Sequence, residues 1–201
     1  MTGQTFINKI RLLTAILFLV AGGSHVAAQK VALKSNLVSD GFLSPNLGIE
    51  VGLAPKWTLE AQGQFNGWVL GHNKRWKHWA AQPEVRYWLC DRFGGHFVGA
   101  HVHGGQFNMG DINNGINFLG TNFSKLSDAR FQGWFVGAGL SYGYDWPIAR
   151  HWNLEPEIGI GYSYTRYDQF RCTGCGKRVA EDRSHHYVGI TRLALSLVYL
   201  F

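Results

Sequence analysis

Apolar and polar residues alternate with a period of two in segment after segment from residue 29 onward. Alternation of this kind is typical of β-strands, because successive side chains of a strand point to opposite faces. It predicts eight strands, over residues 30–37, 47–54, 57–65, 79–90, 96–104, 132–144, 152–164 and 187–201. In the last strand one face would hold Tyr187, Gly189, Thr191, Leu193, Leu195, Leu197, Tyr199 and Phe201, and the other Val188, Ile190, Arg192, Ala194, Ser196, Val198 and Leu200. We therefore expect an all-β chain.

The composition favours a membrane as the surroundings of these strands. Charged residues make up 16% of the chain, below the roughly 25% of an ordinary soluble domain. The polar faces of the strands carry Gly and opposite charges rather than a coat of Lys and Glu. Aromatic residues lie near the strand ends, as in the girdles of outer-membrane barrels: Trp57, Phe65, Trp79, Tyr87, Trp152, Tyr162, Tyr164, Tyr187, Tyr199 and Phe201. The competing interpretation is a soluble barrel or sandwich with its apolar face inward.

The predicted connections alternate between short and long. Those over 54–56, 91–95 and 145–150 are short, whereas those over 38–46, 66–78, 105–129 and 166–186 are long. Outer-membrane barrels have short turns on one side and long loops on the other. The sequence therefore predicts an eight-stranded antiparallel up-and-down transmembrane β-barrel, with both termini on the short-turn side.

The first 28 residues resemble a secretory signal peptide. Lys9 and Arg11 precede an apolar run over 12–20, and Val26-Ala27-Ala28 offers small residues for cleavage before Gln29. We therefore expect residues 1–28 to be the signal peptide and residues 29–201 to be the barrel, located in the outer membrane of a Gram-negative bacterium. The formal net charge is +6 without a clustered basic stripe, so no nucleic-acid partner is expected.

Short motifs carry a resemblance to known outer-membrane proteins. Tyr199 and the terminal Phe201 look like the signal that barrel-assembly machinery recognises, and the layout resembles the small OmpA/OmpX-type barrels. Five segments resemble a family of small outer-membrane barrels of anaerobic Gram-negative bacteria that is described as a domain of unknown function: 34–37, 45–50, 56–59, 82–88 and 103–105. That resemblance implies the barrel fold and a location in the outer membrane. It supplies no activity and no catalytic residue.

Charged and histidine side chains fall on the polar faces of the predicted strands and would point inward. They are Lys34, Glu50, Glu60, Glu84, Arg86, His101, His103, Glu155, Glu157 and Arg192. The structural interpretation is a salt-bridged network that fills an interior only wide enough for side chains. The functional alternatives are paired carboxylates for acid–base chemistry, an ion path, or a metal pair at His101 and His103.

Two cysteines lie in the last long connection. Cys172 and Cys175 have the spacing of a short-range disulfide or of a zinc knuckle with His185 as a third ligand, and free thiols are the remaining alternative. Spacing alone does not decide among them. Cys90 is predicted at a turn on the opposite side, as a free thiol.

A basic aromatic segment lies between Trp68 and Trp79. Its residues Lys74, Arg75, Trp76 and Lys77 are predicted as surface-loop contacts to lipopolysaccharide phosphates or an acidic glycan. The alternative is ordinary anchoring at the membrane interface, which uses the same residue types. The long connection over 105–129 would either bind a partner or shield the mouth of the barrel.

These patterns together favour a structural or interaction role over an enzymatic one, with no cofactor. Envelope integrity, adhesion or support of a surface assembly such as fimbriae would each fit the barrel and its surface loops. Expected partners are outer-membrane lipid and lipopolysaccharide, the barrel-assembly machinery, and a surface or fimbrial protein. The alternatives are a lipid A- or lipid-directed enzyme and a narrow solute channel.

Overall fold

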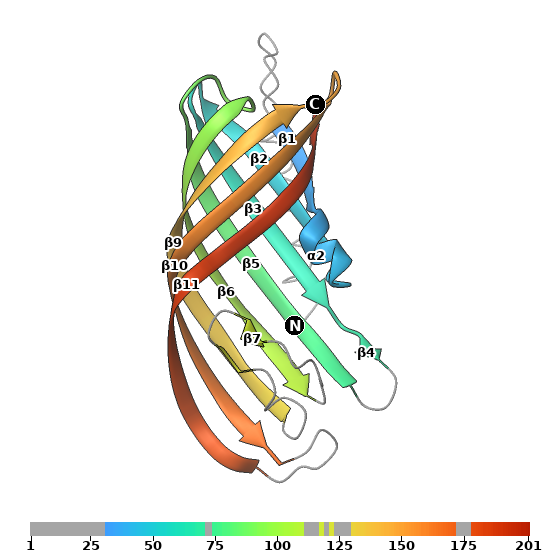
Figure 1. Cartoon of the computed structure of the whole chain (residues 1–201), viewed down its shortest axis with the longest axis vertical. Helices are drawn as coiled ribbons and strands as arrows, with labels where there is room; N and C mark the ends of the chain where they lie inside the picture. Colours follow the sequence, from blue (N-terminus) through green and yellow to red (C-terminus); the bar gives the residue numbers. More distant parts are fainter. Residues whose placement is uncertain (1–30, 71–73, 111–116, 119–120, 123–129, 172–177) are drawn as a thin grey trace, which may run out of the picture.

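The computed structural model describes residues 31–70, 74–110, 117–118, 121–122, 130–171 and 178–201, and it confirms the all-β, antiparallel fold. In this part of the chain, eight strands form one ring-like sheet with up-and-down topology, and pairing between β1 and β11 closes the ring (Figure 1). These strands are β1 (Val31–Asn36), β2 (Asn46–Ala54), β3 (Trp57–Asn66), β5 (Lys74–Trp88), β6 (Gly95–Gly110), β9 (Arg130–Pro147), β10 (Trp152–Phe170) and β11 (Arg178–Leu200). Three two-residue strands lie outside the ring, namely β4 (Val69–Leu70), β7 (Asn117–Phe118) and β8 (Thr121–Asn122).

Side chains alternate between the outside and the inside of the ring. Along β9, Trp134, Val136 and Leu140 are exposed, whereas Ser141 and Asp145 are buried. A ring of eight strands has an interior just wide enough for side chains, so inward residues must pack against one another. The inward positions therefore decide what the interior contains.

An apolar cluster fills the interior at the end where the short turns lie. Trp88 and Phe97 are fully buried there, with ring centroids 4.9 Å apart, and Trp88 Nε1 donates to Thr58 Oγ1 at 2.9 Å. The other members of the cluster are Ala32, Phe93, Val198 and Leu200. The connections at this end span residues 55–56, 89–94 and 148–151, close to the predicted short turns. Cys90 lies in one of them as an exposed free cysteine.

The strands reach further toward the opposite end than the alternation predicts. β5 begins at Lys74, β6 continues to Gly110, and β10 and β11 remain paired as far as Phe170 and Arg178. The predicted long connections over 66–78, 105–129 and 166–186 are therefore wrong in extent. Backbone pairing continues in segments that are largely exposed in β11 and largely half-buried in β6 and β10, without a regular difference between the two faces, and such segments need no alternation of apolar and polar residues.

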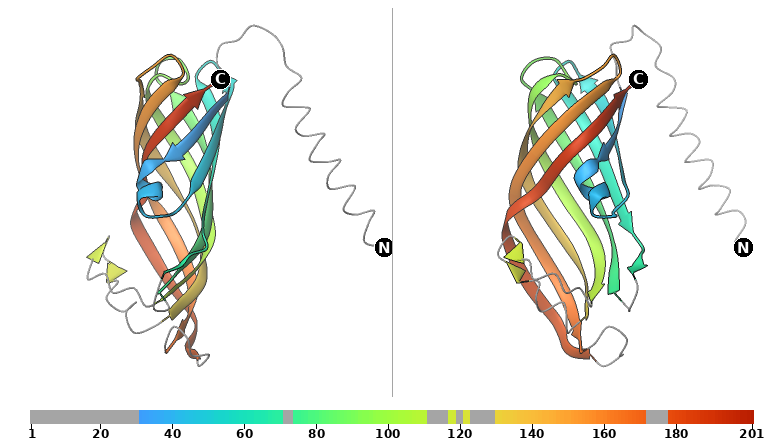
Figure 2. Two further views of the ribbon diagram at one scale, coloured as in Figure 1. Left: turned by 90° about the vertical axis from the view of Figure 1, so that its right-hand side faces the viewer. Right: turned by 45° about the vertical axis from the view of Figure 1, so that its right-hand side comes forward.

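The seam between β1 and β11 is short (Figure 2). β1 has six residues, and its pairing with β11 runs only from Ser196 to Leu200. Beyond Ser196 the side chain of Asn36 continues the pairing, because its Oδ1 accepts from Leu195 N at 3.2 Å and its Nδ2 donates to Leu193 O at 3.3 Å. One amide side chain thus satisfies two backbone groups at the edge of β11.

A five-residue helix, α2 (Leu37–Gly41), follows β1 where the sequence predicts only a connection over 38–46. Asn36 is its N-cap and accepts from Val38 N at 3.1 Å. Asp40 accepts from Ser35 Oγ at 2.7 Å and from Asn46 Nδ2 at 2.9 Å, which holds the helix against the ring. A single turn is too short to show a helical period in the sequence. No helix in the described ranges is long and apolar enough to cross a membrane.

A β-bulge interrupts β11. Gly159 of β10 pairs with Arg192, but the next residue, Ile160, pairs with Ile190, so Thr191 is an extra residue in β11. A bulge of this kind reverses the alternation of side chains on the strand that contains it.

The bulge corrects the predicted faces of the last strand. Thr191 Oγ1 lies 3.0 Å from His101 Nε2, and Arg192 Nη2 donates to Glu60 Oε1 at 2.7 Å, so two consecutive side chains point inward. Val188 is 80% exposed and faces outward, on the same side as the leucines further along β11. The prediction of one unbroken face from 187 to 201 is therefore wrong.

We expect the seam to depend on the Asn36 amide. Asn36→Ala removes both bonds to the β11 edge and leaves those backbone groups unpaired, which should lower the free energy of unfolding by about 1–3 kcal/mol. Urea titration of the folded protein measures this. Ser39→Ala is the control, because it removes a hydroxyl of α2 and leaves both Asn36 bonds to β11 in place. Equal midpoints for Asn36→Ala and the control would contradict this account.

Candidate functional site: a charged network inside the ring

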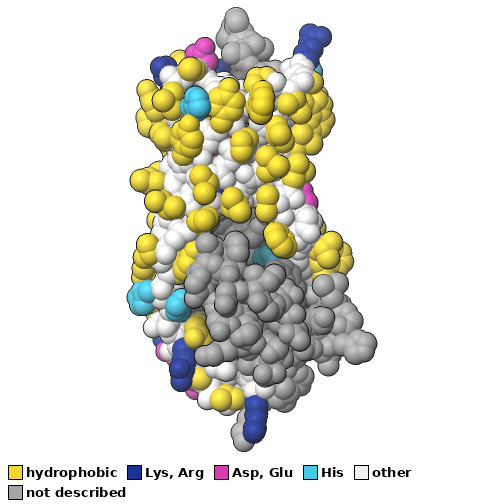
Figure 3. Space-filling view, in the orientation of Figure 1, with side chains coloured by type: hydrophobic (Ala, Val, Ile, Leu, Met, Phe, Trp, Pro, Cys, Tyr) yellow, Lys and Arg dark blue, Asp and Glu magenta, His cyan; other side chains and the backbone are white. Residues whose placement is uncertain are grey.

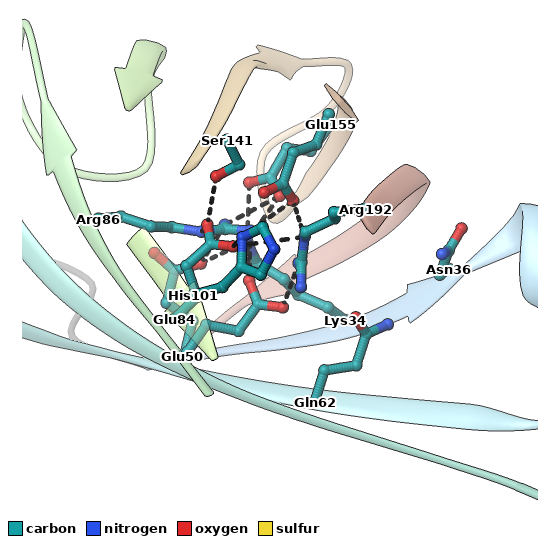
Figure 4. A network of polar contacts seen from close by, with 12 residues as sticks. Lys34, Asn36, Glu50, Gln62, Glu84, Arg86, His101, Ser141, Glu155 and Arg192 are labelled. Carbon is teal, nitrogen blue, oxygen red and sulfur yellow. Dashed lines mark hydrogen bonds and ion pairs between the residues drawn. The ribbon is translucent and has the colours of Figure 1, made fainter. Parts of the chain in front are cut away.

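The ten inward residues predicted from the sequence are all buried, and contacts among them bring them together inside the ring. Figure 4 labels Lys34, Glu50, Glu84, Arg86, His101, Glu155 and Arg192 among them. They come from seven strands: Lys34 from β1, Glu50 from β2, Glu60 from β3, Glu84 and Arg86 from β5, His101 and His103 from β6, Glu155 and Glu157 from β10, and Arg192 from β11. Residues far apart in the sequence meet here because a closed ring directs every second side chain toward one axis.

Three of the carboxylates are direct cross-strand neighbours. Glu50 pairs in register with Glu60, and Glu60 pairs in register with Glu84. Like charges directly opposite each other destabilise a sheet. This row is therefore possible only with cations placed between its members.

Arg86 is the central cation of the network. Its side chain is fully buried, and its Nη1 lies 2.9 Å from both Glu50 Oε2 and Glu155 Oε1. Its Nε donates to Glu84 Oε1 at 2.7 Å. Arg86 Nη2 contacts Glu60 and Glu157 at 2.5 and 2.8 Å. One planar guanidinium thus contacts five carboxylates, because Arg has N–H donors pointing in several directions in one plane.

Lys34 and Arg192 extend the network on either side. Lys34 Nζ pairs with Glu50, and it lies 2.7 Å from Glu155 Oε2 and 3.3 Å from Glu60 Oε2. Arg192 Nη2 donates to Glu60 Oε1 at 2.7 Å. Arg192 Nε lies 2.6 Å from Glu157 Oε2 and 3.5 Å from Glu84 Oε2. Glu60 therefore has all three cations as neighbours.

The network contains more acids than permanent cations. Five buried glutamates face one lysine and two arginines, which leaves two negative charges in excess when all are ionised. Within the residues that the structure describes, Glu50 Oε1 and Glu157 Oε1 have no hydrogen-bond partner. Buried charge of this kind is tolerated only when partners remain close, so removing one cation should be costly. The described ranges contain no group of three or more His, Cys, Asp and Glu that could hold a metal ion.

The two histidines lie next to the charged residues on β6. His101 Nε2 is 3.0 Å from Thr191 Oγ1, and His101 Nδ1 is 3.6 Å from Glu84 Oε2. The rings of His101 and His103 are 5.7 Å apart. Gly137 on the neighbouring strand makes room for His103, since a Cβ there would collide with its imidazole. Within the described residues His101 is therefore hydrogen-bonded to a hydroxyl and lies beside a carboxylate without a hydrogen bond to it.

Asp145 and Asn153 also lie inside the ring, although neither is among the site residues predicted from the sequence. Both are buried and hydrogen-bonded to each other at the short-turn side of the network, and Asn153 Nδ2 also donates to Phe93 O at 3.2 Å. The sequence assigns Asp145 to a turn over 145–150, but β9 continues to Pro147. Continuing the alternation of Ser141 and Gly143 by one more step would have placed Asp145 inside the ring.

The predicted surface-contact residues lie at the beginning of β5. Lys74, Arg75, Trp76 and Lys77 are the first four residues of strand β5, so the prediction that they form a surface loop is wrong. The reason is that Trp76 and Lys77 pair in register with Met109 and Asn108 of β6.

The residues predicted as a disulfide or metal group and as an assembly signal have different positions. Cys172 and Cys175 lie outside the described residues. His185 is exposed on β11, where it pairs with Thr165. Tyr199 and Phe201 lie at the short-turn end with ring centroids 5.0 Å apart, and Phe201 N donates to Val31 O at 3.1 Å.

Ion pairs also occur on the distal part of the β10–β11 hairpin, outside the ring interior. Arg166 pairs with Asp182, and both are exposed. The hydrogen bond and positive charge of Arg166 hold the pKa of the Asp182 carboxyl below its ordinary value. Arg178 lies 3.5 Å from Asp168 and also pairs with Glu181. Exposed pairs of this kind contribute little to stability, because solvent screens them.

The fold and its interior define a class of protein: an eight-stranded antiparallel ring whose centre holds a buried network of charges instead of an apolar core. The chain belongs to the family described as "Protein of unknown function (DUF3575)", which matches residues 14–201. No curated protein and no solved structure gives a significant match.

We expect Arg86 to be the residue on which the network most depends. Arg86→Met leaves five glutamates with two cations and should lower the free energy of unfolding by about 3–5 kcal/mol. Adding Glu50→Gln and Glu155→Gln to this variant should recover part of the loss, because it removes two of the uncompensated charges. Urea titration measures both effects. Arg166→Met, which breaks an exposed pair, is the control and should change little.

Proposed function

We propose that this protein is a small integral outer-membrane β-barrel with a structural or interaction role, performed through the part that extends beyond the membrane. The observation that carries the proposal is the reversal of polarity: charges are buried inside the ring, and large apolar side chains are exposed outside it. Figure 3 shows the apolar side chains gathered over the half nearer the short turns. A sheet with an apolar outside suits lipid, and a closed ring leaves few unpaired backbone groups there.

Two rows of exposed aromatic residues support this placement. The first row includes Trp57 and its register partner Tyr87, and the second includes Phe65 and its partner Trp79. Eight residues separate the rows along β3 and again along β5. At about 3.3 Å per residue and a tilt of about 40°, the rows are about 20 Å apart in height, close to the roughly 25 Å apolar band of such barrels.

The ends of the ring suggest an orientation. The short turns, Val31 and Phe201 lie at one end, which in outer-membrane barrels faces the periplasm. The distal parts of β9, β10 and β11 would then extend outside the cell. We propose these extensions as the contact region for a surface or fimbrial partner, with lipopolysaccharide around the wall. Phe201 and Tyr199 would serve the barrel-assembly machinery during insertion.

The charged network supports a structural role rather than a channel. Salt bridges between Lys34, Arg86 and five glutamates cross the middle of the interior, and the apolar cluster around Trp88 fills the short-turn end. An ion path would require these groups to separate. Their mutual contacts instead connect strands from all around the ring, which favours rigidity.

One observation favours a second candidate, a lipid-directed enzyme. Thr191 Oγ1 lies 3.0 Å from His101 Nε2, and Glu84 Oε2 lies 3.6 Å from His101 Nδ1, which is the order of groups that activates a nucleophile for acyl transfer where both contacts are hydrogen bonds. However, Glu84 is already engaged by Arg86 and Ser141. Within the described residues His101 Nδ1 has no hydrogen-bond partner, so the carboxylate does not orient the imidazole as such a mechanism requires.

Labelling of intact cells tests the proposed location and orientation. In a variant lacking the native cysteines, Val179→Cys places a thiol at an exposed distal position of β11, whereas native Cys90 reports on the short-turn end. We expect a membrane-impermeant maleimide to label Val179→Cys on intact cells, and Cys90, with Cys172 and Cys175 replaced by Ser, only after lysis. Label on Cys90 alone would mean the opposite orientation. Label on neither before lysis would favour a periplasmic protein.

Release of fatty acid from a phospholipid ester separates the two candidates. We expect the wild type in vesicles to release no more than vesicles without protein. Hydrolysis that disappears in Thr191→Val, with folding retained, would favour the enzyme. Thr191→Val keeps the shape of the side chain and removes only the hydroxyl, which makes it the matched variant.

A further inference from the structure

A groove of about 550 Å³ crosses the outer surface of the ring over β3, β5, β6, β9 and β10. Its walls are two adjacent rows of outward-facing residues, and the backbone of the inward row between them forms its floor. One row runs in register through Phe65, Trp79, Gln106 and Trp134. The other runs through Lys77, Asn108, Gln132 and Asp168.

The first wall is aromatic and belongs to the second aromatic row described above, which includes Phe65 and Trp79. Trp79 and Trp134 are 45% and 41% exposed, so their ring faces are available to a ligand. Trp79 Nε1 donates to Gln106 Oε1 at 3.3 Å, which fixes the orientation of that ring. The ring of Trp134 packs 5.8 Å from that of Tyr164. The aromatic wall is therefore held in place by neighbours on the adjacent strands.

The second wall is polar and lies on the side away from the apolar band. It presents two amides, an ammonium group and a carboxylate, from Asn108, Gln132, Lys77 and Asp168. Asn108 Oδ1 is shielded from solvent and has no hydrogen-bond partner within the described ranges. A buried acceptor without a partner is costly, and a hydroxyl or amine from a ligand would satisfy it.

The combination of walls selects the chemistry of the ligand. A saccharide offers C–H faces to aromatic rings, and its hydroxyls both donate and accept hydrogen bonds, as the two amides require. The Asp168 carboxylate already accepts from Asp182 N at 2.9 Å and lies 3.5 Å from Arg178. Lys77 adds an attraction for a phosphate or another anionic substituent. A phospholipid headgroup offers fewer hydroxyls and has no sugar ring whose C–H face could stack on the tryptophans. The groove is therefore more complementary to a phosphorylated sugar than to a phospholipid.

We propose that this groove binds the phosphorylated saccharide headgroup of a glycolipid in the surrounding leaflet. The proposal rests on the proposed membrane placement, since the groove then lies where the apolar band meets the headgroups. Acyl chains would continue along the apolar wall below the aromatic row, and the sugar would lie between the tryptophans and the amides. Because both walls are fixed, we expect the protein to bind one glycolipid molecule in the groove, in addition to any general annulus of lipid around the ring.

Native mass spectrometry of the full chain in micelles tests this with three probes: lipid A, phosphatidylglycerol, and the acyl-free diphosphorylated disaccharide. Matched controls exist because Trp57 and Trp152, in the opposite aromatic row, are 45% and 41% exposed, the same as Trp79 and Trp134. We expect one lipid A to bind, and Trp79→Ala/Trp134→Ala to weaken it about tenfold or more, as loss of a central aromatic contact does. Trp57→Ala/Trp152→Ala should change it less than about twofold.

Three results would overturn the proposal. Equal binding of phosphatidylglycerol would show that the sugar is not recognised, and equal binding of the acyl-free disaccharide would make the source a free glycan. Equal loss in both tryptophan pairs would reduce the effect to interface anchoring. Insertion into vesicles, measured separately by protection from trypsin, distinguishes the proposed membrane placement from the proposed glycolipid site. Without insertion the membrane placement is wrong. Insertion without selectivity for lipid A would contradict only the glycolipid site.

Discussion

The interaction on which the structure depends is the pairing of Arg86 with the glutamates around it. Closing eight strands into a ring forces Glu50, Glu60 and Glu84 onto adjacent inward positions, where they would repel one another. A fully buried guanidinium between them converts this repulsion into attraction between strands. The same contacts reach Glu155 on the far side of the ring, so one side chain links β2, β3, β5 and β10.

The seam shows a second consequence of closure. The strands beside it differ greatly in length, since β1 has six residues and β11 has 23. The Asn36 side chain and α2 therefore occupy the place where a longer β1 would have paired. Of the eight ring strands, β1 has the least backbone pairing, with five register pairs to β11 and four to β2, and side-chain amides continue the pairing beyond its end.

Particular elements show where sequence reasoning was sufficient. The inward positions of Lys34, Glu84 and Arg86 follow from a period of two, because each lies on a strand with one apolar face. Reasoning from the period was insufficient at Thr191, where an inserted residue reverses it, and at Asp145, where a strand runs on into a predicted turn. It was also insufficient for the distal hairpins, since strands without a regular difference in burial between their two faces need no alternation.

The sequence by itself determined the all-β class, the number of ring strands and most of the residues that point inward, because these depend on local side-chain alternation. The tertiary structure alone decided which cation meets which carboxylate, how far the hairpins extend, and that Phe65, Trp79 and Trp134 form one wall of a groove. These features depend on the register between strands. Register is a relation between distant segments, and no single segment carries it.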